Sequence, residues 1–269
     1  VVTGGIDAAV ATLSAGAFAQ GNHVAMIGTS MCWGVVHRGD AVSPHLVSMP
    51  YVAYDSEKVY TFGGAATAGA LVRWFRDEFG TQELAAETAG GPNAFAALSA
   101  LANRVGPCSD GLVLIPLFNG DRTLLDGRLA PGTIVGLSTF HGRTHLYRAM
   151  LEGTAYEIRR RLEQIAPAVP LARIRSVGGG TKNRAWTQIM SDVLAAEQHC
   201  YPETAGAPYG DAYLAGLGIG LFDDFRPLVA TWIRGGYAVR PQADHRAAYE
   251  QMYQLYLDVI ERMGVDRER

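Results

Sequence analysis

The sequence predicts an α/β fold. Short stretches rich in β-branched residues alternate with segments whose apolar residues recur at helical spacing, over most of the 269 residues. Hydrophobic residues make up 48% of the chain and charged residues 18%, which is enough apolar material for a buried core. The sequence contains no internal repeat, no low-complexity tract and no polar linker that would divide it.

The first half of the chain predicts a helix followed by a strand hairpin. Val10, Leu13 and Ala17 share one face of a helix that follows Asp7. Strand patterns at 23–27 and 31–36 are joined by small residues that favour a tight turn. The further elements are a strand at 59–62, a helix through Ala70, Trp74 and Phe75, a helix with Asn93 as its N-cap, and a strand at 112–116.

The second half continues the alternation of strands and helices. The predicted elements are strands at 133–137, 174–177 and 198–201, and helices at 143–162, 183–194 and 208–218. A final helix presents one apolar face, formed by Tyr249, Tyr253, Tyr256, Ile260 and Met263.

Bulk charge and cysteine usage exclude several kinds of partner and site. A net charge of −3 and a pI near 6.2 give no basic field to attract nucleic acid or an anionic membrane. The three cysteines lack a Cys-x-x-Cys spacing, and no apolar run is long enough to cross a bilayer. These features predict a cytoplasmic protein without a disulfide framework. Because the sequence begins with Val1 rather than methionine, we expect a piece of a longer protein.

Four separated segments carry a more specific pattern. The longest contains Gly132, Gly136 and Leu137, continues after seven residues with His145 and Leu146, and ends with the residues at 149–152. The other three are Gly-Gly-Ile-Asp at 4–7, Gly-Thr-Ser at 28–30, and three glycines followed by Thr-Lys-Asn-Arg-Ala-Trp at 178–186. Each short segment alone is weak evidence for a family, but the order and the separations of the four segments are specific.

In this order the segments resemble the FGGY family of carbohydrate kinases, whose second signature the residues at 132–152 match. The resemblance spans Gly4 to about Gly218. It implies a ribonuclease H-like domain of the actin and sugar kinase ATPase type, with a mixed sheet flanked by helices. It also implies that residues 1–269 form the C-terminal, nucleotide-binding domain, and that the N-terminal sugar-binding lobe is missing from this chain.

The resemblance identifies Asp7 as the catalytic base. A helix N-terminus favours the ionised carboxylate, which keeps such a base free of a proton at neutral pH. From the residue pattern alone, Asp7 is instead a helix N-cap, because aspartate is favoured there.

The nucleotide site implied by the resemblance begins at the hairpin turn. Gly28, Thr29 and Ser30 supply small side chains, exposed backbone N–H groups and two hydroxyls, which suit close approach to a polyphosphate. Any hairpin turn accepts the same three residues, so the resemblance makes Thr29 the best single candidate for a phosphate contact.

Two further segments complete the implied nucleotide site. Gly179 and Gly180 let the backbone lie against an adenosine, and Asn183 can hydrogen-bond the base or the ribose. Glycine runs are also common in plain loops. Gly69 and Arg73 match a family segment that lines the nucleotide cleft, although glycerol kinase has glutamine in place of Arg73. The alternative is that Arg73 lies on a solvated helix face.

The metal-binding signals are weak. His141 and His145 stand four residues apart, but no His-Glu-x-x-His glutamate accompanies them, so we predict packing and hydrogen bonding rather than zinc. Asp121, Asp126 and Glu152 are the carboxylates that could hold magnesium through water. No protein metal ligand is assigned.

Together these features predict an ATP-dependent kinase that uses Mg²⁺ and phosphorylates a ketopentose. The residues at 61–77 and 143–156 resemble those of xylulokinase more than those of glycerol kinase. Ribulose, glycerol and erythritol are the alternative substrates. An actin-like or chaperone-like ATPase without sugar transfer, and a degenerate domain that only binds a partner, are the alternative classes. The resemblance further implies a homodimer, because family members are often dimers.

Overall fold

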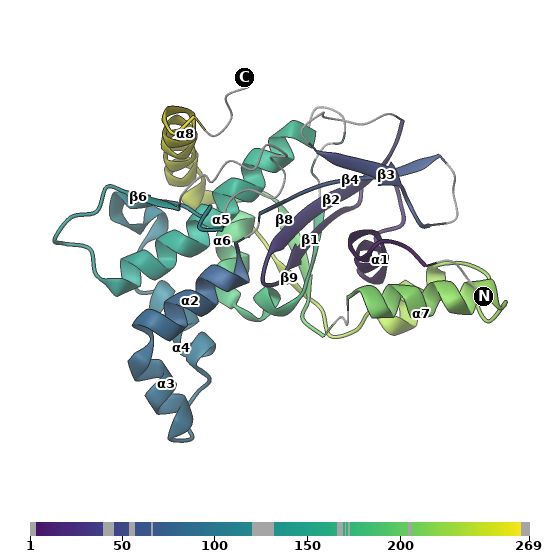
Figure 1. Cartoon of the computed structure of the whole chain (residues 1–269), viewed down its shortest axis with the longest axis horizontal. Coiled ribbons are helices and arrows are strands. Elements are labelled where there is room, and N and C mark those ends of the chain that lie inside the picture. The colour runs from purple at the N-terminus through teal and green to yellow at the C-terminus, as the bar shows by residue number, and fades with distance from the viewer. Residues whose placement is uncertain are drawn as a thin grey trace.

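The computed structural model describes residues 4–39, 46–53, 57–65, 67–119, 132–165, 169, 171, 173–203 and 206–264. Its centre is a seven-stranded sheet in the order β3-β4-β2-β1-β7-β8-β9, with helices on both faces (Figure 1). This arrangement confirms the predicted α/β class.

The sheet is mixed, as the sequence resemblance implied. Its strands are β1 (His23–Ile27), β2 (Met31–Arg38), β3 (Val47–Pro50), β4 (Lys58–Ala65), β7 (Arg173–Val177), β8 (Glu197–Tyr201) and β9 (Tyr237–Val239). β1 forms the predicted antiparallel hairpin with β2 and pairs in parallel with β7. β7 pairs in parallel with β8, whereas the pairs β2–β4, β3–β4 and β8–β9 are antiparallel.

The helices divide between the two faces of the sheet. α1 (Asp7–Ser14) and α7 (Ala207–Gly218) pack together on one face, with a π-helical turn at Leu228–Trp232 beside them. The other face carries α2 (Gly69–Phe79), α4 (Ala94–Ala102), α5 (Arg143–Ile165), α6 (Arg184–Leu194) and α8 (Arg246–Arg262). α3 (Thr81–Thr88) packs against α2 and α4. Short 3₁₀ turns lie at Pro107–Gly111, Gly179–Lys182 and Ala243–His245, and a separate two-stranded sheet joins β5 (Val113–Ile115) to β6 (Thr133–Val135). Within the described residues, no helix is both long enough and apolar enough to span a membrane.

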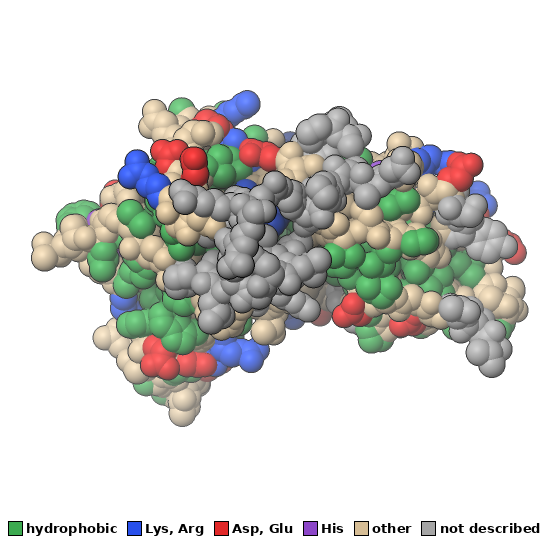
Figure 2. All heavy atoms as spheres, turned by 45° about the horizontal axis from the view of Figure 1, so that its top comes forward, with side chains coloured by type: hydrophobic (Ala, Val, Ile, Leu, Met, Phe, Trp, Pro, Cys, Tyr) green, Lys and Arg blue, Asp and Glu red, His purple; other side chains and the backbone are tan. Residues whose placement is uncertain are grey.

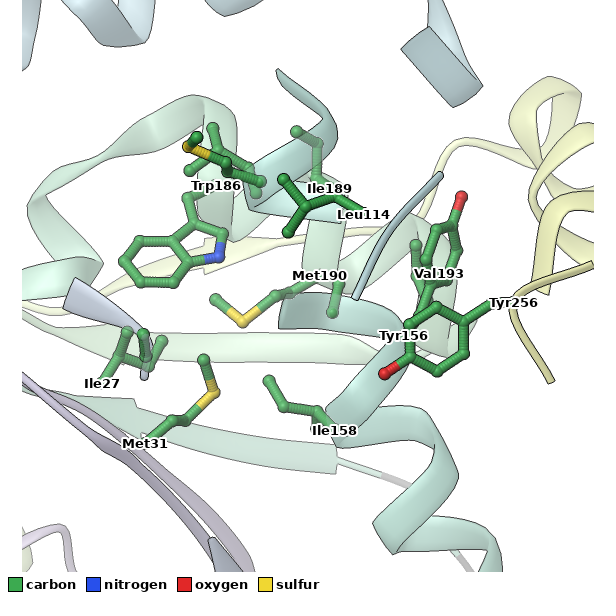
Figure 3. Close-up of a cluster of buried hydrophobic side chains, with 14 of the residues drawn as sticks. Ile27, Met31, Leu114, Tyr156, Ile158, Trp186, Ile189, Met190, Val193 and Tyr256 are labelled. Atoms are coloured by element: carbon green, nitrogen blue, oxygen red, sulfur yellow. The ribbon is translucent and has the colours of Figure 1, made fainter. Parts of the chain in front are cut away.

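The central strands are buried on both faces. In β1, Ala25 and Ile27 belong to the larger core, whereas Val24 packs on the opposite side of the sheet, as strand geometry requires. Figure 3 shows the larger core, in which Trp186 and Met190 of α6 lie near Ile27 and Met31. The Trp186 indole N–H donates to Thr154 Oγ1 of α5 at 2.8 Å, so this polar group is satisfied inside the core.

Most predicted elements are confirmed, with small changes at their ends. The strand predicted at 133–137 stops at Val135, because Gly136 adopts a left-handed conformation with φ +86°. The sequence did not indicate β3, α3 or β9. β3 and β9 are short edge strands, and α3 buries only Glu83, so none of them has a long apolar pattern.

The surface carries both signs of charge. On the face shown in Figure 2, acidic and basic side chains are interspersed among apolar and neutral polar groups. This distribution agrees with the small net charge of −3.

A buried ion cluster joins α5 to the last helix, α8. The Glu157 carboxylate accepts hydrogen bonds from Arg160 Nη2 at 2.7 Å, Arg161 Nε at 2.9 Å and the Tyr256 hydroxyl at 2.7 Å. Burial opposes ionisation, but the attraction of the two guanidinium groups outweighs it and lowers the pKa of Glu157 to about 2. The cluster therefore holds a charged carboxylate inside the fold.

We predict that Glu157→Gln lowers the free energy of unfolding at pH 7 by about 3–5 kcal/mol, because two buried guanidinium groups lose their counter-charge. The folded-state pKa lies below the ordinary value of 4.5, so the wild-type carboxylate stabilises fully above that value. Its contribution is lost as the pH falls through about 2. The difference in free energy of unfolding between the wild type and Glu157→Gln should therefore narrow as the pH falls from 4.5 to about 2.

Urea denaturation followed by circular dichroism at several pH values measures this difference. Glu261→Gln, on the exposed side of α8, is the control and should change stability by less than about 0.5 kcal/mol. A Glu157→Gln difference that did not shrink in acid would show that the carboxylate is not held in its charged form.

Candidate functional site

The site is organised around the turn between β1 and β2. The first turn of α2 sits directly on this turn, where Gly69 N donates to Gly28 O at 3.0 Å and Ala70 N donates to Thr29 O at 2.9 Å. A Cβ on Gly69 would lie 2.4 Å from Gly28 O, so only glycine fits here. The backbone of the turn is therefore fixed, while no described group hydrogen-bonds the Thr29 hydroxyl.

A cavity of about 520 Å³, which we call the glycine-rich cavity, opens beside this turn. Seven of the eight predicted nucleotide-binding residues line it, namely Gly28, Thr29, Gly69, Arg73, Gly179, Gly180 and Asn183. They come from the β1–β2 turn, from α2 and from the segment between β7 and α6, so the fold brings together residues more than one hundred positions apart.

A second cavity of about 530 Å³, the Asp7 cavity, adjoins the first. Asp7 and Ser30 line it, so Ser30 faces this cavity rather than the glycine-rich one. Gly28, in the β1–β2 turn, lines both cavities, and we call this shared residue their junction. The site therefore has two compartments that meet at one glycine.

Asp7 is the first residue of α1 and is not its N-cap. Ile6 occupies the N-cap position, and the Asp7 carboxylate accepts a hydrogen bond from the neighbouring Ala8 N–H at 2.7 Å. This corrects the N-cap interpretation that the residue pattern favoured. The carboxylate is exposed and borders the Asp7 cavity.

The glycines after β7 differ in what the fold requires of them. A Cβ on Gly180 would lie 2.2 Å from Ile27 Cγ2 and 3.0 Å from the Trp186 ring, so packing of the core excludes a side chain there. A Cβ on Gly179 would meet nothing within 4 Å. Gly179 thus leaves open space along the cavity wall that the protein itself does not fill.

Asn183 closes the cavity as the N-cap of α6. Its Oδ1 accepts from Trp186 N at 3.0 Å and from Ser99 Oγ at 2.7 Å, and its Nδ2 donates to the Tyr147 hydroxyl at 3.1 Å. Burial raises the pKa of Tyr147, so its hydroxyl stays protonated. The side chain that was expected to contact a base or ribose is therefore already held by three partners.

Two cationic side chains line the glycine-rich cavity. Among the described residues, no group pairs with Arg73, which lies one turn after the start of α2. Lys182 Nζ lies 3.5 Å from Glu203, and both side chains are largely exposed. An exposed pair of this kind is weak, which leaves the ammonium group available to another anion.

The other polar groups singled out in the sequence serve the structure. His145 Nε2 lies 3.2 Å from Asp110 Oδ2, and His141 contacts Ser138 at 3.0 Å. Glu152 is buried and accepts hydrogen bonds from Arg148 and Ser109, so it does not face either cavity. Its pKa is raised because burial outweighs the attraction of Arg148.

The described residues do not form a magnesium site of their own. Asp121 and Asp126 lie outside the described residues. Within the described part of the chain, no group of three or more His, Cys, Asp or Glu side chains is arranged to hold a metal ion.

Sequence reasoning missed the α4 side of the glycine-rich cavity. Asn93, Phe95 and Ala96 line it, together with Lys182 and Trp186. Asn93 was recognised as a helix N-cap, which its bond to Phe95 N at 3.1 Å confirms. No pattern in the sequence indicated that this helix end would meet the glycines after β7.

Comparisons with known proteins agree with this arrangement. The family model for the C-terminal domain of the FGGY family of carbohydrate kinases matches residues 23–219. The gluconokinase of Bacillus subtilis is 29% identical over 262 residues, which cover 96% of this chain and 50% of that protein. The xylulose kinase of the same organism is 26% identical over 263 residues, which cover 96% of this chain and 50% of that protein.

The solved structures give the same result. The crystal structure of xylulose kinase from Rhodospirillum rubrum superposes with a TM-score of 0.82 at 26% identity, covering 96% of this chain and 50% of that one. The predicted ribonuclease H-like ATPase fold is confirmed. This chain spans about half the length of the curated relatives it matches. With the family match covering most of its length, the chain belongs to the FGGY family of carbohydrate kinases and contains the C-terminal domain of that family.

Proposed function

We propose that this chain is the nucleotide-binding half of a longer kinase that transfers the γ-phosphoryl group of ATP to a hydroxyl of a small sugar. The observation that carries the proposal is the junction of two cavities at Gly28. One compartment offers glycine backbone, a hydroxyl and cations to a nucleotide, and the other offers Asp7 to the acceptor. This is the arrangement that a phosphoryl transfer between two bound molecules needs.

In this proposal the β1–β2 turn binds the phosphates. The Thr29 hydroxyl donates to a phosphate oxygen, as in other anion-binding turns. The Gly28 N–H is already used, because it donates to Ser30 O at 3.0 Å. Arg73 and Lys182 add positive charge along the same wall. Bound with ATP, Mg²⁺ would neutralise charge on the phosphates, although the described residues offer no ligand set of their own.

Asp7 acts as the general base in the second compartment. Phosphoryl transfer proceeds through a loose transition state, so a weak base that accepts the hydroxyl proton late is sufficient. The Ala8 N–H donates to the Asp7 carboxylate at 2.7 Å and holds it at the start of α1, beside the cavity.

The acceptor that we propose is a ketopentose, with gluconate as the second candidate. The likeness to the xylulose kinases of Bacillus subtilis and Rhodospirillum rubrum supports a ketopentose. The likeness to a gluconokinase, at 29% identity, supports gluconate. We expect much of the acceptor site in the other half of the kinase. A cytoplasmic location and a homodimer remain predictions from the family resemblance.

We predict that the full-length protein releases ADP in step with consumption of one preferred acceptor. A coupled assay with D-xylulose, D- and L-ribulose, L-xylulose, glycerol, erythritol and D-gluconate identifies it. Turnover with a ketopentose supports the first candidate, and turnover with gluconate alone replaces it with the second. ATP hydrolysis that ignores every acceptor would favour an ATPase module instead.

We predict that Asp7→Asn in the same protein lowers kcat by about 10²- to 10⁴-fold, because the acceptor hydroxyl loses its base. The Kd for MgADP should stay within about twofold, since Asp7 borders only the neighbouring compartment. Steady-state kinetics and calorimetry measure the two effects. Asp244→Asn, at an exposed aspartate that lines neither cavity, is the control. Unchanged turnover in Asp7→Asn would place the base elsewhere.

We predict that alanine at Gly179 weakens nucleotide binding, whereas alanine at Gly180 lowers stability. Gly179→Ala should leave stability nearly unchanged but raise the Kd for MgADP about tenfold, because its methyl group fills space needed by the nucleotide. Gly180→Ala should lower the free energy of unfolding by about 1–3 kcal/mol through its clash with Ile27 and Trp186. Thermal unfolding and calorimetry separate these effects. If Gly179→Ala bound MgADP normally, the nucleotide would not lie against this backbone.

A further inference from the structure

We propose that the glycine-rich cavity selects a nucleotide by its phosphates and by stacking, and does not read the edge of the base. The site should therefore accept guanine and hypoxanthine nucleotides about as well as adenine nucleotides. This inference rests on the proposed nucleotide site and concerns which nucleotides that site accepts.

The two compartments fix which way the nucleotide lies. Its transferable phosphate must reach the junction at Gly28, because Asp7 and the acceptor lie beyond it. The base then lies at the other end, which is formed by Asn93, Phe95 and Ala96 of the α4 N-terminus and by Asn183 at the start of α6. Any group that distinguishes one purine from another must therefore belong to this end.

The side-chain amides at this end are committed to the fold. Asn183 Oδ1 accepts two hydrogen bonds, from Trp186 N and Ser99 Oγ, and its Nδ2 donates to Tyr147. Asn93 Oδ1 accepts from Phe95 N at 3.1 Å, and its Nδ2 donates to Glu87 Oε1 at 2.6 Å. Neither amide can rotate to suit a ligand without uncapping a helix.

Several backbone acceptors beside the cavity are also used. Gly178 O accepts from Thr181 N at 3.0 Å and from Thr181 Oγ1 at 2.7 Å, and Gly180 O accepts from Asn183 N at 3.1 Å. Asn93 O accepts from Ala97 N at 3.0 Å, within the first turn of α4. These carbonyl groups are therefore turned toward their own helix ends.

What remains at this end is a pair of amide donors, which match acceptor nitrogens that all purines share. One amide hydrogen is left on each of Asn93 and Asn183, and such a donor matches purine ring nitrogens that accept hydrogen bonds in both adenine and guanine. The two bases differ at position 6, where adenine carries an amino donor and guanine a carbonyl acceptor. Selecting adenine would require an acceptor facing its amino group, but Asn183 Oδ1 already accepts two hydrogen bonds and Asn93 Oδ1 is held by the Phe95 N–H that it caps.

The groups that do remain available suit the rest of the nucleotide. The Phe95 ring lines the cavity and is held by the Arg76 guanidinium, 4.5 Å from the ring centroid, and Gly179 leaves open wall beside it. An aromatic ring at the cavity wall can stack on any purine, because every base has a π-face. Arg73, Lys182 and the Thr29 hydroxyl are further donors along the cavity, and they suit phosphate oxygens.

Calorimetric titration of the protein with MgADP, MgGDP and MgIDP tests the inference. We expect three Kd values within tenfold of one another. A site that reads hydrogen bonds can discriminate by about 10⁴-fold, so a preference above tenfold for any one base overturns the inference while leaving the nucleotide site intact. Absence of binding by all three, with the protein folded by circular dichroism, would overturn the proposed nucleotide site itself.

The variants Asn183→Ser and Asn93→Ser test whether either asparagine amide contributes to the choice of base. Serine keeps a good N-cap residue but removes the amide. We expect each variant to change the Kd for MgADP and for MgGDP by the same factor, within about threefold, because the amides position helix ends and do not read the base. If the affinity for MgADP alone fell more than tenfold in either variant, that asparagine would be the reader of adenine and the inference would fail.

Discussion

The whole site depends on the contact between the first turn of α2 and the β1–β2 turn. Two backbone hydrogen bonds, from Gly69 to Gly28 and from Ala70 to Thr29, join them directly. A side chain on Gly69 would meet the Gly28 carbonyl, so no other residue permits this approach. The contact fixes the wall shared by the two cavities and leaves the Thr29 hydroxyl available.

A second set of polar contacts fixes the opposite wall. Asn183 caps α6 while it also bonds Ser99 of α4 and Tyr147 of α5, so three helices meet at one side chain. Its neighbour Trp186 packs into the core against Ile27 and donates to Thr154. This wall of the glycine-rich cavity is therefore continuous with the hydrophobic core, and the core restricts its movement.

The sequence predicted the parts of this structure whose signals are local. The hairpin at 23–36, the Asn93 cap and the apolar face of α8 each follow from residues a few positions apart. The cavity face formed by Phe95 was not predictable in this way. It depends on a hydrogen bond between Ser99 and Asn183, which are 84 positions apart, and no periodicity encodes such a contact. Two of the three hydrogen-bond partners of Asn183 are likewise distant in the sequence, and only the structure shows them.

The glycines of the site separate into two kinds once the space around each is known. Gly69 and Gly180 are required by the fold, because a Cβ on either would collide with neighbouring atoms. Gly28 and Gly179 are not required in this way, since a Cβ on Gly28 would meet only Ser30 O, at 3.5 Å, and one on Gly179 would meet nothing. Both of these glycines border the glycine-rich cavity. Packing therefore explains the first pair, whereas the second pair leaves open space along the cavity wall, which the proposed nucleotide site requires.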